Sequence, residues 1–433
     1  MTGEDYPVSF PAEEAPTAGR LPADRREFLR ARLAGKRAGP AAAQTTAIPR
    51  RPANVPVTLS FAQQRLWVLG KMVPGSPFYT ESTALRFSAA IDPDLLGRAI
   101  NTIVARHEVL RTTLPEVDGR PMARVAERVH IPLDLTDLSD LPPERQLGEV
   151  TRLATEEARR PFSLASGPLL RTALIRLRPA EWVFLLSMHH IVCDGWSSAV
   201  FSNELSTLYA DLAADRPPSL PDLPIQYSDF ALWQREWLSG ERMERQLGYW
   251  RHRLADLAPL ELPTDHRRPA VFSYSGSRRS FRLPRTLADA LEKLGREEGA
   301  TLFMTLMMGF DCLLHRLTDQ DDIAIGTPVA GRTRRELEPL IGFFVNSLII
   351  RTDLSGRPSY REVLRRVRTR ALEAYDHQDL PFEKLVEDLQ PERDLARNPL
   401  FQVIFQLHAD QSAVTEARAE GGFGVIEVDR ATT

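Results

Sequence analysis

The stretch Glu181–Leu212 constrains the fold most, because its periodicity changes from strand-like to helical across one short polar loop. Val183–Met188 is an apolar, partly β-branched and aromatic run of strand length. From Trp196 onward the apolar residues recur close to the spacing of an α-helix. We therefore predict a strand, a loop with the sequence HHIVCDG, and a helix.

The loop carries side chains that can transfer protons. His189 and His190 are adjacent at the strand end and point to opposite faces, so at most one of them faces a given cavity. A neutral imidazole accepts a proton near neutral pH. If Asp194 is buried it needs a cation or donors, and Gly195 lets a substrate approach the backbone. The alternative interpretation is a pair of core histidines with satisfied hydrogen bonds.

Composition and charge exclude several classes of protein. A net charge of −3 over 433 residues shows no electrostatic sign of nucleic-acid binding. Cys193 and Cys312 are the only cysteines, too few for a disulfide framework or a metal cluster. We find no signal peptide and no apolar run of membrane-spanning length. We therefore expect a cytoplasmic protein without a metal, a nucleic-acid partner or a membrane partner.

Changes in composition divide the chain into three predicted parts. Residues 1–54 are rich in Pro, Ala, Gly and Arg, so we expect a flexible leader with one short helix at Asp24–Leu33. The Pro-rich segment Ala214–Pro224 is predicted to separate two lobes. Residues 55–225 form the N-terminal lobe with the HHIVCDG loop, and residues 226–433 form the C-terminal lobe.

Six motifs follow one another along the chain. They are LSFAQQRLWVL from Leu59, RHEVLRTTL from Arg106, HHIVCDG from His189, YSDFALWQ from Tyr227, the pair GTPVAGR and IGFFVNS from Gly326 and Ile341, and HQDLPFEKLVEDLQPERDLARNPLFQVIF from His377. In order and spacing they resemble the motifs of the condensation domains of nonribosomal peptide synthetases, in the chloramphenicol acetyltransferase-like superfamily. HHIVCDG matches the family's active-site pattern, HHxxxDG.

The resemblance implies a fold. We expect an α/β protein of two chloramphenicol acetyltransferase-like lobes that form a V-shaped pseudo-dimer, with the active site between them. Residues 1–54 would then be a linker, or carry a short docking helix, toward an upstream carrier protein. Family members normally continue past the point that corresponds to Thr433. We therefore expect a C-terminal lobe that is incomplete relative to the family.

The resemblance also implies a function in the biosynthesis of antibiotics and other secondary metabolites. The α-amine of a downstream aminoacyl thioester attacks an upstream acyl or peptidyl thioester. Each substrate is tethered to the phosphopantetheine arm of a peptidyl carrier protein, an adenylation domain is adjacent, and no intrinsic cofactor is implied. The segment MHHIVCDGWSS looks more like members that take an L-configured donor. Three alternatives stay open: a noncatalytic platform that recruits carriers or oxygenases, an epimerisation domain, and a standalone acyltransferase.

Within this mechanism the motif residues receive roles. His190 is predicted to orient the amine and accept its proton, while His189 supports the strand end. The N–H groups around Gly195 and Trp196 are predicted to meet the oxyanion.

The other motif residues are predicted to shape the site. Asp194 is predicted to be structural and to pair with Arg106, with Arg111 as the other candidate partner. Three residues are candidates for lining a substrate tunnel or contacting the oxyanion, namely Trp196, Ser197 and Asn346.

Overall fold

The computed structural model describes residues 47–269, 276–277, 279–390, 397–408 and 423–425. The predicted helix at Asp24–Leu33 and the rest of the predicted leader up to residue 46 lie outside these ranges.

A five-stranded sheet carries the predicted strand at its centre. The strands lie in the order β11 (Phe423–Val425), β1 (Thr80–Phe87), β8 (Glu181–His189), β7 (Leu170–Arg178) and β6 (Leu133–Asp137). All neighbours are antiparallel except β6 and β7. The apolar run at Val183–Met188 is therefore the interior of β8, which has a hydrogen-bonded partner on each side.

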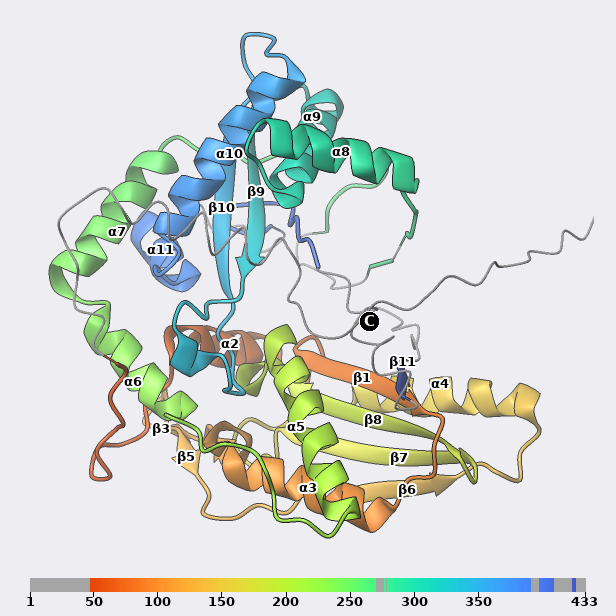
Figure 1. Cartoon of the computed structure of the whole chain (residues 1–433). Helices are drawn as coiled ribbons and strands as arrows, with labels where there is room; N and C mark the ends of the chain where they lie inside the picture. The colour runs from red at the N-terminus through yellow and green to blue at the C-terminus, as the bar shows by residue number, and fades with distance from the viewer. Residues whose placement is uncertain (1–46, 270–275, 278, 391–396, 409–422, 426–433) are drawn as a thin grey trace, which may run out of the picture. The chain divides into compact units, whose positions relative to one another are not determined.

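Helices cover both faces of this sheet (Figure 1). On one face α3 (Pro93–Arg106) and α5 (Gly195–Ala213) pack with Phe184 and Met188 of β8. On the other face α4 (Pro143–Arg159) packs with Val183 and Leu185 of the same strand. Because both faces of β8 are buried, the strand shows a continuous apolar run rather than an alternation.

Shorter elements complete this part of the chain. The helix α2 (Phe61–Met72) begins at a capping box formed by Ser60 and Gln63. Two small antiparallel ladders pair β2 (Thr112–Thr113) with β5 (Arg124–Val125) and β3 (Glu116–Val117) with β4 (Arg120–Pro121). Single 3-10 turns occupy Glu108–Arg111 (η1) and His190–Val192 (η2).

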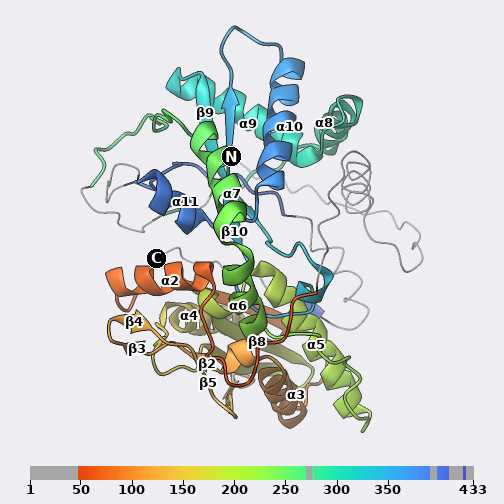
Figure 2. The same ribbon diagram turned by 90° about the vertical axis from the view of Figure 1, so that its left-hand side faces the viewer.

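The second half of the described chain has its own core. After α6 (Tyr227–Trp237) and α7 (Gly240–Arg253), which follow one another along the side facing the viewer in Figure 2, come α8 (Arg285–Glu297) and α9 (Leu302–Thr318). The strands β9 (Asp322–Val329) and β10 (Asn346–Asp353) form an antiparallel pair. The remaining elements are η3 (Arg335–Leu337), α10 (Tyr360–Asp376) and α11 (Phe382–Leu389). Residues of α9, both strands and α10 share one buried apolar cluster.

The prediction of a flexible leader up to residue 54 is wrong for residues 47–54. Ile48 is buried in the first core cluster. The Arg50 guanidinium donates to the carbonyl oxygens of Leu223 and Pro224, and the Arg51 N–H donates to Asp229 Oδ1 at 2.8 Å. One buried isoleucine and these hydrogen bonds anchor a segment that composition alone places in a linker.

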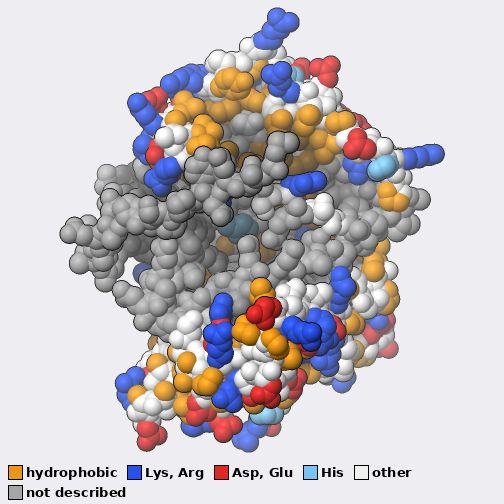
Figure 3. Space-filling model, turned by 90° about the vertical axis from the view of Figure 1, so that its right-hand side faces the viewer, with side chains coloured by type: hydrophobic (Ala, Val, Ile, Leu, Met, Phe, Trp, Pro, Cys, Tyr) orange, Lys and Arg blue, Asp and Glu red, His pale blue; other side chains and the backbone are white. Residues whose placement is uncertain are grey.

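Apolar side chains gather on the face that carries α8 and α9 (Figure 3). The exposed large apolar residues of these two helices are Leu287, Leu313 and Leu317, and Leu283 lies just before α8. Within the described ranges no single helix is long and apolar enough to cross a membrane, although α8 and α9, which meet at a bend of 105°, reach that length and composition as a pair.

Candidate active site

His190 lies where β8 ends and its ring is held in one tautomer. The backbone N–H of His190 continues the ladder to Tyr79 O at 2.7 Å. The ring Nδ1 lies 2.7 Å from Cys193 O. Because a carbonyl oxygen only accepts, Nδ1 carries the proton and Nε2 of the neutral ring keeps its lone pair. With 27% of its side chain exposed, His190 is placed to accept a proton at Nε2.

Two side chains flank the His190 ring. The Phe343 ring packs edge-on against it with 4.9 Å between ring centroids. The Glu81 Oε1 lies 3.5 Å from His190 Nε2. Our sequence analysis missed both residues: Glu81 lies twelve positions beyond the end of the first motif, and Phe343 occurs in a motif to which we had assigned only Asn346.

His189 is buried beside the active-site loop. Its Nδ1 accepts the backbone N–H of Ile191 at 3.0 Å. Burial, and to a lesser extent the neighbouring His190, lowers the pKa of His189 to about 4, so the ring is neutral. The ring also lies between Tyr79 and Phe162, with centroids 6.2 and 6.1 Å away. These contacts support the predicted role of His189 in holding the strand end.

Asp194 ties the start of α5 to a distant segment. Its Oδ1 caps the helix by accepting the Ser197 N–H at 2.8 Å and also lies 3.1 Å from Arg332 Nη2. Its Oδ2 accepts the Phe344 N–H at 3.0 Å. The side chains of Asp194 and Arg332 are each only 1% exposed. Burial lowers the pKa of Arg332, and the Asp194 carboxylate opposes this change, so the two ions depend on each other.

The predicted pairing of Asp194 with Arg106 or Arg111 is wrong. Arg106 Nε donates to Glu204 Oε1 at 3.0 Å. Glu204 is ten residues beyond Asp194 on α5, which is about 15 Å along a helix axis, so Arg106 cannot reach the cap. The Arg111 guanidinium donates to backbone carbonyls, among them that of Val104 at 3.2 Å. The true partner, Arg332, comes from the GTPVAGR motif, and no spacing rule connects that motif to HHIVCDG.

Ser197 does not face a substrate channel, so its prediction as a tunnel or oxyanion residue is wrong. The side chain is completely buried. Its Oγ lies 2.7 Å from Asp194 Oδ1 and 2.8 Å from Gly342 O, and it accepts the Gly342 N–H at 3.0 Å. Ser197 therefore fastens the segment around Gly342 to the first turn of α5.

Trp196 makes a second link of this kind. Its indole Nε1–H donates to Glu338 O at 2.9 Å. The indole thus attaches the start of α5 to the residue that follows η3. The role of Trp196 in lining a substrate tunnel or contacting the oxyanion stays a prediction.

The segment Ile341–Phe344 is held by hydrogen bonds from several elements. Tyr227 Oη donates to Phe343 O at 2.6 Å, and burial raises the pKa of Tyr227 so that it remains a donor. His107 Nδ1 lies 3.4 Å from the Ile341 nitrogen, while its Nε2 lies 2.9 Å from Glu204. A Cβ at Gly342 would approach the Tyr227 ring to 2.0 Å, so this close approach requires glycine. This segment presents the Phe343 ring to His190.

Gly195 leaves open space at the start of α5. It is exposed, and a Cβ built on it would meet no heavy atom within 4 Å. Its φ is not positive, so the backbone itself does not demand glycine. The first N–H groups of a helix have no intrahelical partners, and a reacting oxygen could approach them here.

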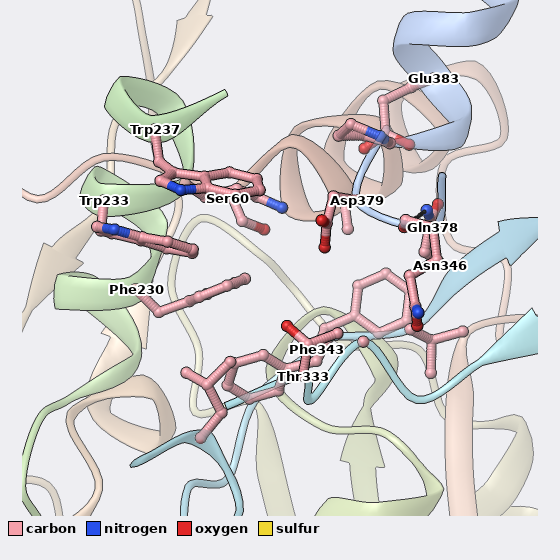
Figure 4. A pocket seen from close by; sticks show the side chains of 17 residues that line it. Ser60, Phe230, Trp233, Trp237, Thr333, Phe343, Asn346, Gln378, Asp379 and Glu383 are labelled. Atoms are coloured by element: carbon pink, nitrogen blue, oxygen red, sulfur yellow. Dashed lines mark hydrogen bonds between the residues drawn. The ribbon is translucent and has the colours of Figure 1, made fainter. Parts of the chain in front are cut away.

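A cavity that is partly open to solvent lies beside this region (Figure 4). On one side Phe230, Trp233 and Trp237 of α6 lie one above another, and across the cavity stand Asn346 and Asp379. Phe343, which contacts His190, is also part of the lining.

Asn346 supports the wall of this cavity. Its Nδ2 donates to Gln378 O at 2.9 Å and Leu380 O at 2.7 Å, and its Oδ1 accepts the Phe382 N–H at 2.9 Å. These bonds hold the segment before α11 against β10. Whether Asn346 also lines a substrate tunnel stays a prediction.

The described part of the chain contains no group of three His, Cys, Asp or Glu side chains that could hold a metal ion. The Cys193 thiol next to the active-site loop is fully buried, and burial raises its pKa. It therefore stays a thiol and packs as a small apolar side chain.

Comparisons with known proteins agree with this arrangement. The Condensation domain family matches residues 55–432. The chain is 48% identical to a linear gramicidin synthase polypeptide of Brevibacillus parabrevis over 84% of its own length and 5% of that protein. It is 44% identical to the phosphinothricin tripeptide synthetase PhsC of Streptomyces viridochromogenes over 87% of its length and 35% of that protein. The chain thus spans only a small part of these relatives.

A solved structure shows the same fold. The X-domain from teicoplanin biosynthesis, in its complex with OxyB, superposes with a TM-score of 0.75 at 29% identity, over 84% of this chain and 80% of the other. The predicted α/β fold of the chloramphenicol acetyltransferase-like class is thereby confirmed. From the family match and the identities above, the chain belongs to the condensation domain family of nonribosomal peptide synthetases.

Proposed function

We propose that this condensation domain forms an amide bond between two substrates that are tethered to carrier proteins. The α-amine of a downstream aminoacyl thioester would attack the carbonyl carbon of an upstream acyl or peptidyl thioester. The observation that carries this proposal is the partly exposed side chain of His190, whose ring orientation and tautomer are set by the 2.7 Å contact of Nδ1 with Cys193 O.

His190 supplies the proton acceptor in this reaction. As the C–N bond forms, the amine nitrogen gains positive charge, and Nε2 takes one of its protons. The C–S bond then breaks, and the proton passes from the imidazolium to the leaving sulfur, so that a free thiol results. The amine is partly neutral near pH 8, so holding it on the attack line is as important as removing its proton.

Gly195 and Trp196 supply the second part of the proposal. Their backbone N–H groups lie at the start of α5 and would stabilise the negative charge on the carbonyl oxygen. The open space in front of Gly195 supports this assignment, since a carbonyl group could enter there.

The partners follow from the family. We propose upstream and downstream peptidyl carrier proteins, each with a phosphopantetheine arm, and an adjacent adenylation domain. The names of the relatives as a synthase and a synthetase support this setting. We also propose that the domain takes an L-configured donor, because its segment MHHIVCDGWSS resembles that of members with this preference. We keep the division into lobes at residues 55–225 and 226–433 as a proposal, with the pair Asp194–Arg332 joining them.

The test is amide formation between loaded carriers in a reconstituted assay. Wild type is expected to form the dipeptide product, and His190→Ala is expected to lose it while its Tm is unchanged. His130→Ala, which removes an exposed histidine from the same half of the chain, is the matched control and should retain activity. Turnover by His190→Ala at the wild-type rate contradicts the assignment of His190.

A noncatalytic platform is the second candidate function. The likeness to an X-domain that was solved in complex with OxyB favours it. A wild-type chain that forms no amide but binds a loaded carrier in calorimetry would support this candidate. The same assay addresses the remaining alternatives: inversion of a carrier-bound aminoacyl group would indicate epimerisation, and turnover of a soluble thioester without a carrier would indicate a standalone acyltransferase.

A further inference from the structure

The register of the central sheet brings a carboxylate to His190. In the antiparallel ladder between β1 and β8, Glu81 lies directly opposite Met188. His190 comes directly after β8, and its N–H donates to Tyr79 O just before β1, so the ladder brings His190 beside the start of β1, where Glu81 lies. The 3.5 Å between Glu81 Oε1 and His190 Nε2 shows that the two side chains do meet.

The carboxylate lies on the reactive side of the ring. Cys193 O occupies Nδ1, so a proton that the ring gains must sit on Nε2, toward Glu81. A negative charge at this distance attracts the positive charge that the ring gains when it accepts the proton of the amine.

Other ionisable groups around His190 do not supply this charge. His189, on the preceding position of β8, is neutral because burial lowers its pKa to about 4. The Asp194 carboxylate is paired with Arg332 and accepts the Phe344 N–H. Phe343, from the segment before β10, contributes an apolar ring edge. Within the described residues Glu81 is therefore the carboxylate placed to act on His190.

We propose that Glu81 is a positioning residue that orients His190 and stabilises the imidazolium formed during amide synthesis. The inference rests on the proposed function and adds a residue to its proton-transfer step. The proton moves from the amine nitrogen to Nε2 and then to the leaving sulfur. The Glu81 carboxylate, 3.5 Å from Nε2, holds the intermediate cation by its negative charge.

Solvent limits how large the effect can be. The side chains of Glu81 and His190 are 37% and 27% exposed, so water and salt screen their interaction. We take a dielectric constant close to that of water for this pair. The attraction between two unit charges at this separation then corresponds to about a three- to tenfold change in rate.

The experiment compares three variants in the carrier assay, with kcat and KM measured separately. Glu81→Gln removes the charge, Glu81→Asp keeps it on a shorter side chain, and Glu181→Gln is the matched control. Glu181 is the first residue of β8 and pairs with Arg86. Its substitution therefore neutralises the same kind of carboxylate at the end of β8 that is farther from His190. Glu181 lies about 30 Å from the active-site end of β8.

Glu81→Gln is expected to lower kcat about three- to tenfold, with unchanged KM and Tm. The loss appears in kcat because the charge acts on the cation that forms during the reaction and not on the bound substrates. Glu81→Asp is expected to recover part of the rate, and Glu181→Gln to match wild type. A purely structural role for Glu81 would lower Tm and leave the kcat of the folded protein unchanged.

The outcomes separate this inference from the proposed function. If wild type is active, His190→Ala is inactive and Glu81→Gln shows the wild-type kcat, the role of Glu81 is overturned while the function stands. If wild type forms no amide, the proposed function is overturned and the role of Glu81 falls with it.

Discussion

Removing the Asp194 carboxylate is the sharpest test of how the site is held together. In Asp194→Ala the Arg332 guanidinium remains, with 1% of its side chain exposed and without its anionic partner. Leaving a buried ion unpaired costs about 3–5 kcal/mol. The loss of the helix cap on the Ser197 N–H adds about 1 kcal/mol. We therefore expect the free energy of unfolding to fall by at least about 4 kcal/mol, a large share of the total for a typical protein.

The assay is unfolding by urea and by heat. For a unit of this size one kcal/mol corresponds to about 1 °C of Tm, so Asp194→Ala should melt about 5 °C lower than wild type. The matched control is Glu149→Gln, which breaks an exposed ion pair with Arg152 on α4 and should leave Tm unchanged.

A double variant identifies the cause. Arg332→Met in the Asp194→Ala background removes the uncompensated cation, so the double variant should be more stable than Asp194→Ala alone. An unchanged Tm for Asp194→Ala, or a double variant whose loss equals the sum of the two single losses, would refute the argument that the buried pair holds this site.

Two further predictions concern stability and the start of α5. Asp311 is completely buried in the second core, and burial raises its pKa to about 8. The folded state therefore keeps a proton that the unfolded state loses near pH 4, and stability should fall as pH rises from about 4 to about 8 and then level off. Asp311→Asn should flatten this slope in Tm measured between pH 5 and pH 8, and parallel curves for the two proteins would contradict the assignment. Gly195→Ala should keep the wild-type Tm, because its Cβ meets no atom within 4 Å, but should lower kcat in the carrier assay by filling the space in front of the proposed oxyanion donors. Full activity of Gly195→Ala would show that the reacting carbonyl does not enter there.

Local patterns in the sequence determined the elements that carry the site. The apolar run Val183–Met188 became the interior of β8, and the helical repeat after Trp196 became α5. Such patterns are readable because neighbours along one chain set strand or helix geometry through short-range spacing. The motif order likewise identified the family, and it drew attention to His190.

The partners of those elements were not readable in the same way. Arg106 was a reasonable partner for Asp194 by motif, but α5 places Glu204 beside Arg106 instead. Residues 47–54 look like linker in composition, yet Ile48 is buried because the folded core offers it a place.

The tertiary structure alone decided which side chains surround His190. Glu81 reaches Nε2 because β1 pairs with β8 in one register, and a shift by one residue would turn it to the other face. Arg332 reaches Asp194 across 138 residues of sequence because the Ile341–Phe344 segment and α5 pack together. The physical reason is that secondary structure depends on spacing within a few residues, whereas ion pairs and sheet register depend on which distant surfaces the whole fold brings into contact.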